Sequence, residues 1–136
     1  MEILSDIQFQ ARLLRAVIPT LMAVLFAQSG LDKVFDFRGN LSWMTDHFSK
    51  TFLRGVIPVS LVAITVLELA SALLCAGGAI AVLLGGSVAP AFWGMLLSAV
   101  TLLALFAGQR IAKDYAGAAS IALYVGIAVL GMLALH

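Results

Sequence analysis

Four long apolar segments divide the chain. They cover residues 15–35, 56–78, 89–108 and 115–135, and short polar stretches separate them. A helix rises about 1.5 Å per residue, so about 20 apolar residues cross a hydrocarbon core that is about 30 Å thick. The pattern therefore predicts an all-α membrane protein, an antiparallel four-transmembrane-helix bundle that forms a single domain over residues 1–136.

The first connection is the only long polar segment, and it has a helical pattern of its own. Its apolar residues recur every three or four positions: Phe37, Leu41, Met44 and Phe48. This spacing predicts a short amphipathic helix that lies on the membrane surface, with Asn40 as its cap and Trp43 as an interfacial anchor. His47 is expected to face solvent.

The N-terminal residues 1–14 mix charged and apolar side chains, and they are expected to lie at the membrane interface before the first span. Glu2 and Asp6 do not fit the basic start of a secretory signal peptide. We therefore expect the first apolar segment to be a permanent span.

One ionisable side chain interrupts the second span. Glu68 lies ten residues after Pro58, which places it about 15 Å into the helix and near the middle of a membrane. Small or polar residues share its face: Leu61, Thr65, Ser71, Ala72 and Cys75. A carboxylate at that depth is costly and usually faces a partner or a wet cavity, so we expect this face to point into the bundle. The second span is expected to loosen at Gly77 and Gly78.

The third and fourth spans carry stripes of small residues. The third has Gly94, Ser98, Thr101, Leu105 and Gly108 at alternating spacings of four and three, and the fourth has Ala118, Ala122 and Gly126. Both spacings are typical of close helix packing in membranes.

Composition and charge agree with a membrane location. Hydrophobic residues make up 62% of the chain and charged residues 11%, whereas a soluble domain has about 25% charged residues. The first and third loops hold most of the positive charge: Lys33, Arg38, Lys50, Arg54, Arg110 and Lys113. Only Arg12 and Arg15 lie on the other side, so those two loops are expected in the cytoplasm and both termini outside.

Several kinds of chemistry find little support. The single cysteine, Cys75, excludes an intrachain disulfide and a C-x-x-C dithiol. His47 and His136 do not sit on facing spans, so a bis-histidine haem within the bundle is excluded, and a lone histidine is a poor argument for a metal site. No basic aromatic patch points to nucleic acid.

Four stretches together resemble the DoxX family of small four-span bacterial membrane proteins. They are SGLDKVFDFRGN (29–40), WMTDHFSKTFL (43–53), LELASALLCAGG (67–78) and QRIAKDYAGAAS (109–120). The polar positions that match the family are Gly30, Lys33, Glu68, Arg110 and Asp114. The resemblance implies a four-helix bundle with a structured first loop, and redox chemistry beside the quinone pool with an oxidoreductase or sulfurtransferase partner. It brings no defined catalytic set.

The candidate quinone, ligand or proton site consists of Glu68, Tyr124, Ser98, Lys33 and Arg110. Glu68 is either a protonatable group beside a ligand or a protonated carboxyl that bonds Tyr124 or Ser98 and holds helices together. The basic residues of the loops, among them Lys33 and Arg110, either form an ion-pair network with Asp32, Asp36 and Asp114 at a pocket mouth or only set topology. Tyr124 and Cys75 are more simply core residues.

The expected function is that of an integral membrane subunit that supports redox chemistry, by binding quinone or by docking an oxidoreductase partner, rather than a self-sufficient enzyme. One alternative is a structural or maturation protein without a cofactor. A weaker alternative is a small-solute transporter. Transport would need a continuous polar path, which a homo-oligomer could form between its subunits.

Overall fold

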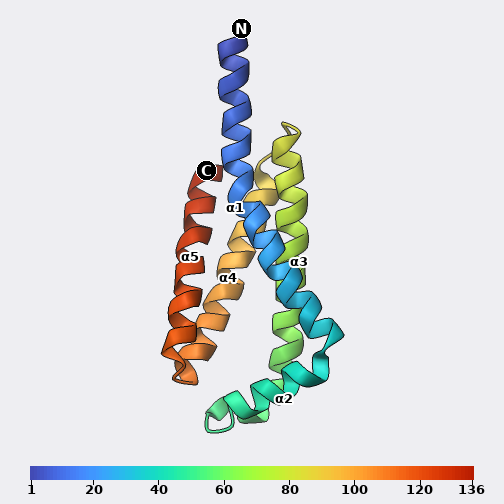
Figure 1. The fold of residues 1–136 in the computed structure, drawn as a ribbon, viewed down its shortest axis with the longest axis vertical. Helices are drawn as coiled ribbons and strands as arrows, with labels where there is room; N and C mark the ends of the chain where they lie inside the picture. The colour runs from blue at the N-terminus through green and yellow to red at the C-terminus, as the bar shows by residue number, and fades with distance from the viewer.

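The computed structural model describes all residues from Met1 to His136, and they form helices joined by loops (Figure 1). The elements are α1 (Glu2–Phe35), α2 (Phe37–His47), the short 3₁₀ helix η1 (Phe52–Gly55), α3 (Ile57–Leu83), α4 (Ala89–Ile111) and α5 (Tyr115–Leu135). Four of them, α1, α3, α4 and α5, are long and apolar enough to cross a membrane. The prediction of an all-α chain with four such helices is confirmed, and the chain has the helices of a multi-pass membrane protein.

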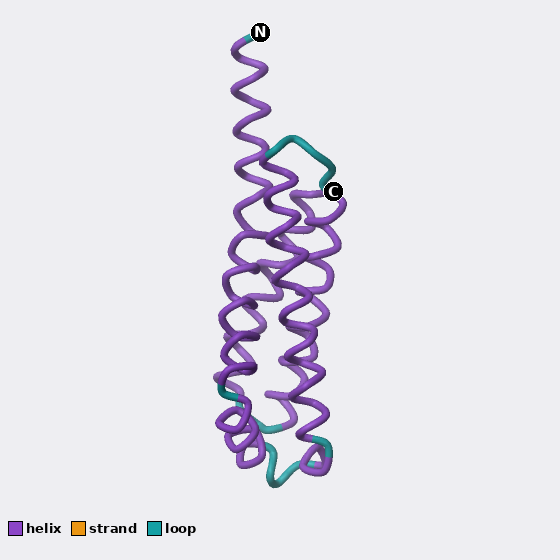
Figure 2. Tube along the Cα trace, turned by 90° about the vertical axis from the view of Figure 1, so that its right-hand side faces the viewer, coloured by secondary structure: helices purple, strands orange, loops and turns teal.

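The long helices pack in a simple order. α1 lies against α3, α3 against α4, and α4 against α5 (Figures 1 and 2). The segment that holds α2 and η1 lies at the same end of the molecule as the turn between α4 and α5, and both termini lie toward the other end (Figure 1). The first and third loops therefore share one end of the molecule.

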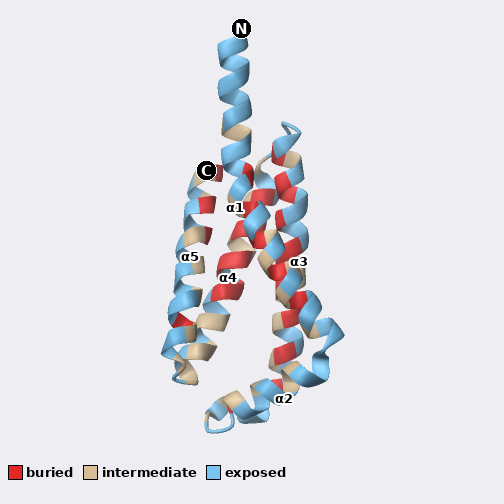
Figure 3. Cartoon of the chain, in the orientation of Figure 1, coloured by how far each residue is buried: buried red, intermediate tan, exposed pale blue.

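Buried residues gather where the helices face one another, and apolar side chains cover much of the outside (Figure 3). Val59, Val66 and Leu73 of α3 are 60% to 76% exposed, although an aqueous surface would disfavour them. Lipid as the surrounding solvent removes this cost, because hydrocarbon tails are as apolar as these side chains.

Residues 1–14 lead directly into the first span. They continue α1 without a break, and the first turns project beyond the other helices with their side chains exposed (Figure 3). No glycine or proline precedes Pro19, so nothing in the sequence ends a helix between Glu2 and that position.

The second span was predicted to end at residue 78, but α3 continues through Gly77 and Gly78 to Leu83. Gly78 faces the backbone of Ala91 in α4 so closely that a Cβ atom would overlap it, whereas Gly77 has open space around it. Gly78 therefore serves close approach between α3 and α4 and does not end the helix. The chain reverses at Gly85, which has a positive φ of 79°.

The small residues of α4 pack as predicted, but those of α5 do not. Gly94 and Ser98 are buried against α3, and a Cβ atom on Gly94 would lie 2.9 Å from the backbone nitrogen of Cys75. In α5, Ala118 is buried while Ala122 and Gly126 face outward. The prediction of a packing face at these three residues of α5 is thus wrong within one chain. α5 packs mainly against α4, and its buried small residues include Ala128 and Gly131 instead.

The helix in the first loop exists, but its cap differs from the expected one. Asp36 is the N-cap of α2, and its carboxylate accepts a hydrogen bond from the backbone nitrogen of Gly39 at 3.2 Å. Asn40 lies inside the helix and donates to the Asp36 carbonyl and to the Asp32 carboxylate, at 2.9 and 3.2 Å. An N-cap side chain lies just before the helix and accepts a hydrogen bond from a backbone N–H of the first turn. Asp36 occupies this position and Asn40 does not.

Candidate functional site

Two of the predicted site residues form a buried ion pair. The Lys33 ammonium of α1 lies 3.2 Å from Oε2 of Glu68 in α3, and the two side chains are 14% and 1% exposed. Glu68 is therefore charge-paired rather than bonded to Tyr124 or Ser98, which corrects that expectation. Each partner offsets the cost of burying the other, so removal of one alone leaves an uncompensated charge.

The Lys33 side chain is held by its own helix as well. Its ammonium donates to the Ser29 hydroxyl at 2.8 Å and is 3.4 Å from the Ser29 carbonyl, one turn earlier in α1. Together with Glu68, these acceptors can use all three donors of a lysine. The ammonium is thus fixed in position without any further partner.

Close approach of α1 and α3 makes this pairing possible. Gly30 lies next to Ser29 on α1, and a Cβ atom there would lie 2.7 Å from a methyl carbon of Leu69 and 3.5 Å from Cβ of Glu68. A larger residue would have to displace the Leu69 side chain. The absence of a side chain at this point lets a lysine reach a carboxylate on the neighbouring helix.

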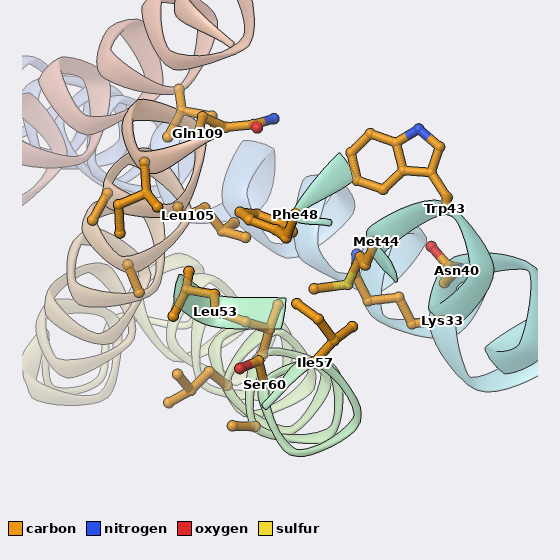
Figure 4. Close-up of a pocket in the computed structure, with 18 residues that line it drawn as sticks. Lys33, Asn40, Trp43, Met44, Phe48, Leu53, Ile57, Ser60, Leu105 and Gln109 are labelled. Atoms are coloured by element: carbon orange, nitrogen blue, oxygen red, sulfur yellow. The ribbon is translucent and has the colours of Figure 1, made fainter. Parts of the chain in front are cut away.

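A large apolar pocket begins at Lys33. Its volume is about 500 Å³, within the range of small-molecule sites, and 13 of its 18 lining residues are hydrophobic. Figure 4 shows Met44, Phe48 and Leu53 of the first loop beside Ile57 of α3 and Leu105 of α4. The first loop therefore covers a space between α3 and α4.

The pocket results from uneven spacing of α3 and α4. Glycines bring the two helices together near the turn that connects them, with Gly78 against Ala91 and Gly94 against Cys75. At the opposite end the space between α3 and α4 takes the ring of Phe48, which is 7% exposed and lies 3.5 Å from the position of a Cβ atom on Gly108. Small residues at one end and a loop side chain at the other thus leave a wedge-shaped space.

A second cavity of about 120 Å³ lies beside Glu68. Ser29, Glu68 and Tyr124 line it together with apolar side chains. Tyr124 is half-buried in α5, so the structure brings it to the same cavity as Glu68. Lys33 lines the large pocket and Glu68 the small cavity, and Leu105 and Ile121 line both.

Ser98 belongs to another cluster. Its hydroxyl donates to the Gly94 carbonyl at 2.8 Å and lies 3.3 Å from the Cys75 sulfur. A similar pair, Ser71 and Thr101, has hydroxyls 3.4 Å apart. These buried contacts join α3 to α4, and Cys75 is a core residue of that interface.

Arg110 takes no part in the Lys33–Glu68 ion pair. Its guanidinium lies over the ring of Tyr115, 4.6 Å from the ring centre, and its side chain is exposed. The expected network at the pocket mouth does not form: Lys33 pairs with Glu68, and the Asp114 carboxylate lies 3.7 Å from Nε2 of His47 rather than beside a Lys or Arg side chain. Asp32 and Asp36 bond α2 instead of the basic residues.

His47 is not free in solvent, which corrects the sequence-based prediction. Its Nε2 lies 2.7 Å from Oε1 of Gln109 and 3.7 Å from the Asp114 carboxylate, and its ring stacks on Trp43 with centroids 4.4 Å apart. Gln109 can only accept at that oxygen, so Nε2 carries the proton. His47 thereby ties the first loop to the turn between α4 and α5.

Sequence reasoning missed these two pairings, although part of the signal was present. Ser29 and Lys33 are one helical turn apart and flank Gly30, so they share the face on which α1 can approach another helix. No comparable pattern connects His47 to Gln109, since they are 62 residues apart.

The chain matches no protein-family model, no curated protein and no solved structure. The resemblance to the DoxX family therefore stays a prediction that depends on the four stretches quoted above.

Proposed function

We propose that the four long helices form an antiparallel transmembrane bundle in a bacterial inner membrane. The α2 helix lies in the membrane interface, with the first and third loops in the cytoplasm. Half-buried or buried positions on one side of α2, namely Leu41, Met44 and Phe48, support an amphipathic helix. The excess of Lys and Arg in the two loops supports the orientation.

Within this bundle we propose a DoxX-like subunit that supports redox chemistry by binding quinone. The observation that carries the proposal is the buried Lys33–Glu68 pair at the edge of an apolar pocket of about 500 Å³. Ionisable groups inside a membrane are rare and mark ligand or proton paths by default. An apolar pocket with a few polar groups is also the usual form of a small-molecule site.

The two residues would have different tasks. The Lys33 ammonium lines the large pocket, so it is the donor that would bind a carbonyl oxygen there. Glu68 would hold or pass a proton through the smaller cavity that it shares with Tyr124. A bound quinone would supply the redox chemistry, and an oxidoreductase partner would supply or accept the electrons.

The test is gentle purification of tagged protein from its native membrane, with mass spectrometry of the co-purified lipids and proteins. We expect quinone to co-purify with the wild type and to be lost from Glu68→Leu. Wild-type protein that carries neither quinone nor an oxidoreductase would refute the redox function.

A structural or maturation role is the second candidate, and a specific observation favours it. All three donors of Lys33 already have protein acceptors, so the pair needs no ligand to hold α1 against α3. In that case the double variant Lys33→Met, Glu68→Leu, which leaves no buried charge without a partner, would leave the phenotype of the native host intact. A redox site predicts that the double variant loses function, because neither new side chain can carry a charge or release a proton.

A further inference from the structure

We infer that the pocket beneath α2 binds a neutral amphiphile whose uncharged head group carries a hydrogen-bond-accepting oxygen beside Lys33 and whose apolar body lies between α3 and α4. The inference rests on the proposed function for a ligand beside the ion pair. It adds that the pocket selects against a charged head group, so that it would take neutral amphiphiles other than a quinone as well.

The size and the lining of the pocket determine the apolar part of the ligand. The cavity beside Glu68, about 120 Å³, holds at most a few atoms, whereas the pocket beneath α2 measures about 500 Å³. Apart from Lys33, no charged side chain lines it, and Ile57, Leu105 and Ile121 form part of its walls. Such walls favour a ring or chain of hydrocarbon, since burial of apolar surface drives binding there.

The donors available in the pocket determine where the head group binds. Asn40 lines the pocket, but its amide already donates to Asp32 and Asp36. Neutral donors share the lining, on Trp43, Ser60 and Gln109. Lys33 is the charged donor, and a charge-assisted hydrogen bond is roughly twice as strong as a neutral one. Its 3.4 Å contact with the Ser29 carbonyl is the longest of its three and is the one that a ligand oxygen can most readily replace.

The charge of the head group follows from the ion pair. Lys33 is already neutralised by Glu68, which is 1% exposed, so the site as a whole carries no net charge. A carboxylate head would have to take Lys33 away from Glu68 and leave that side chain charged and buried, which is strongly unfavourable. An uncharged carbonyl needs only one donor and leaves the ion pair intact.

Two matched probes test this inference in protein reconstituted into liposomes. One is a fatty acid with a diazirine in its chain, and the other is the methyl ester of the same acid. At alkaline pH the acid is ionised. After irradiation, peptide mass spectrometry locates the labelled residues. We expect the ester to label pocket residues such as Met44 and Leu53 about tenfold more than the acid does, a ratio typical of one unfavourable charge interaction.

Two variants make the test specific. In Glu68→Gln the Lys33 charge loses its partner, so the acid should label the pocket more strongly than the ester does. Ala104→Phe fills the pocket and should abolish labelling by both probes, whereas Leu103→Phe, at the neighbouring position that does not line the pocket, should not. Equal or preferential labelling of wild-type pocket residues by the acid, or persistent labelling of Ala104→Phe, would overturn the inference.

The two proposals can fail separately. Protein that carries no native quinone, but shows ester labelling of the pocket and inversion in Glu68→Gln, refutes the quinone function and supports the neutral-amphiphile site. Protein that carries quinone but shows no ester labelling of the pocket refutes this inference alone.

Discussion

At the scale of single residues, the pairing of Lys33 with Glu68 distinguishes this bundle from four packed apolar helices. The pair joins α1 to α3, and its two residues line different cavities. Glu68 could be singled out from the sequence, because one acid in a long apolar stretch is unusual. Its partner could not be predicted. Lys33, Ser98 and Tyr124 lie on three different helices, and the packing of these helices around α3 decides which side chain meets the carboxylate.

The stability of single and double variants should show the pairing. Lys33→Met or Glu68→Leu alone should lower the free energy of unfolding by about 3–5 kcal/mol, because each leaves one buried charge without its partner. The double variant should return to within about 1 kcal/mol of the wild type, since two apolar side chains need no partner. Denaturant unfolding in detergent micelles measures all four proteins, and additive losses would contradict the pairing.

At the scale of helices, the sequence predicted which faces of α3 and α4 are buried, because polar and small residues recur at helical spacing along both. It did not predict the face of α5, where Ala122 and Gly126 match a packing motif but point outward. A motif of small residues shows where a close contact is allowed, and only the neighbouring helices decide which allowed contact forms.

Two adjacent glycines of α3 provide a test of this contact. Gly78→Ala should destabilise the protein by about 1–3 kcal/mol, because the new Cβ atom meets the backbone of Ala91. Gly77→Ala is the matched control. It should stabilise the protein by about 0.5–1 kcal/mol, because alanine is the better helix former and has open space there. Thermal unfolding in detergent distinguishes the two, and similar shifts of both variants would argue against a close α3–α4 contact.

At the scale of the whole molecule, the first loop closes one end of the bundle. Phe48 enters between the helices, and His47 binds the turn between α4 and α5. The sequence indicated a helix in this loop through its apolar spacing, but it gave no sign of where that helix would dock. Contacts between such distant positions depend on how the four long helices are placed, which local pattern does not contain.

Loss of the His47 contact should loosen this end of the molecule. His47→Ala removes a hydrogen bond worth about 1 kcal/mol, so amide hydrogen exchange in residues 37–56 should become roughly fivefold faster. His136→Ala changes an exposed histidine at the C-terminal end and should leave exchange in this segment unchanged. Hydrogen exchange with mass spectrometry gives both values, and equal exchange in His47→Ala and the wild type would show that the contact does not hold the loop.

Orientation in the membrane is a property of the whole molecule as well. In a Cys75→Ser background, a cysteine at Lys50 or at Ser5 can be labelled from one side with a membrane-impermeant maleimide. With the first loop in the cytoplasm, intact cells stripped of their outer membrane should label the cysteine at position 5 only. Labelling of position 50 alone would reverse the orientation.

The central claim is that the Lys33–Glu68 pair serves a bound molecule and not only the packing of α1 on α3. The most direct measurement is the quinone content per protein of the Lys33→Met, Glu68→Leu double variant, purified beside the wild type from the same native membranes. This variant is expected to fold, so its quinone content reports on the site and not on loss of the protein. We expect a folded double variant without quinone. A folded double variant that retains the quinone content of the wild type would contradict a ligand-binding role of the pair and would leave it with a structural role.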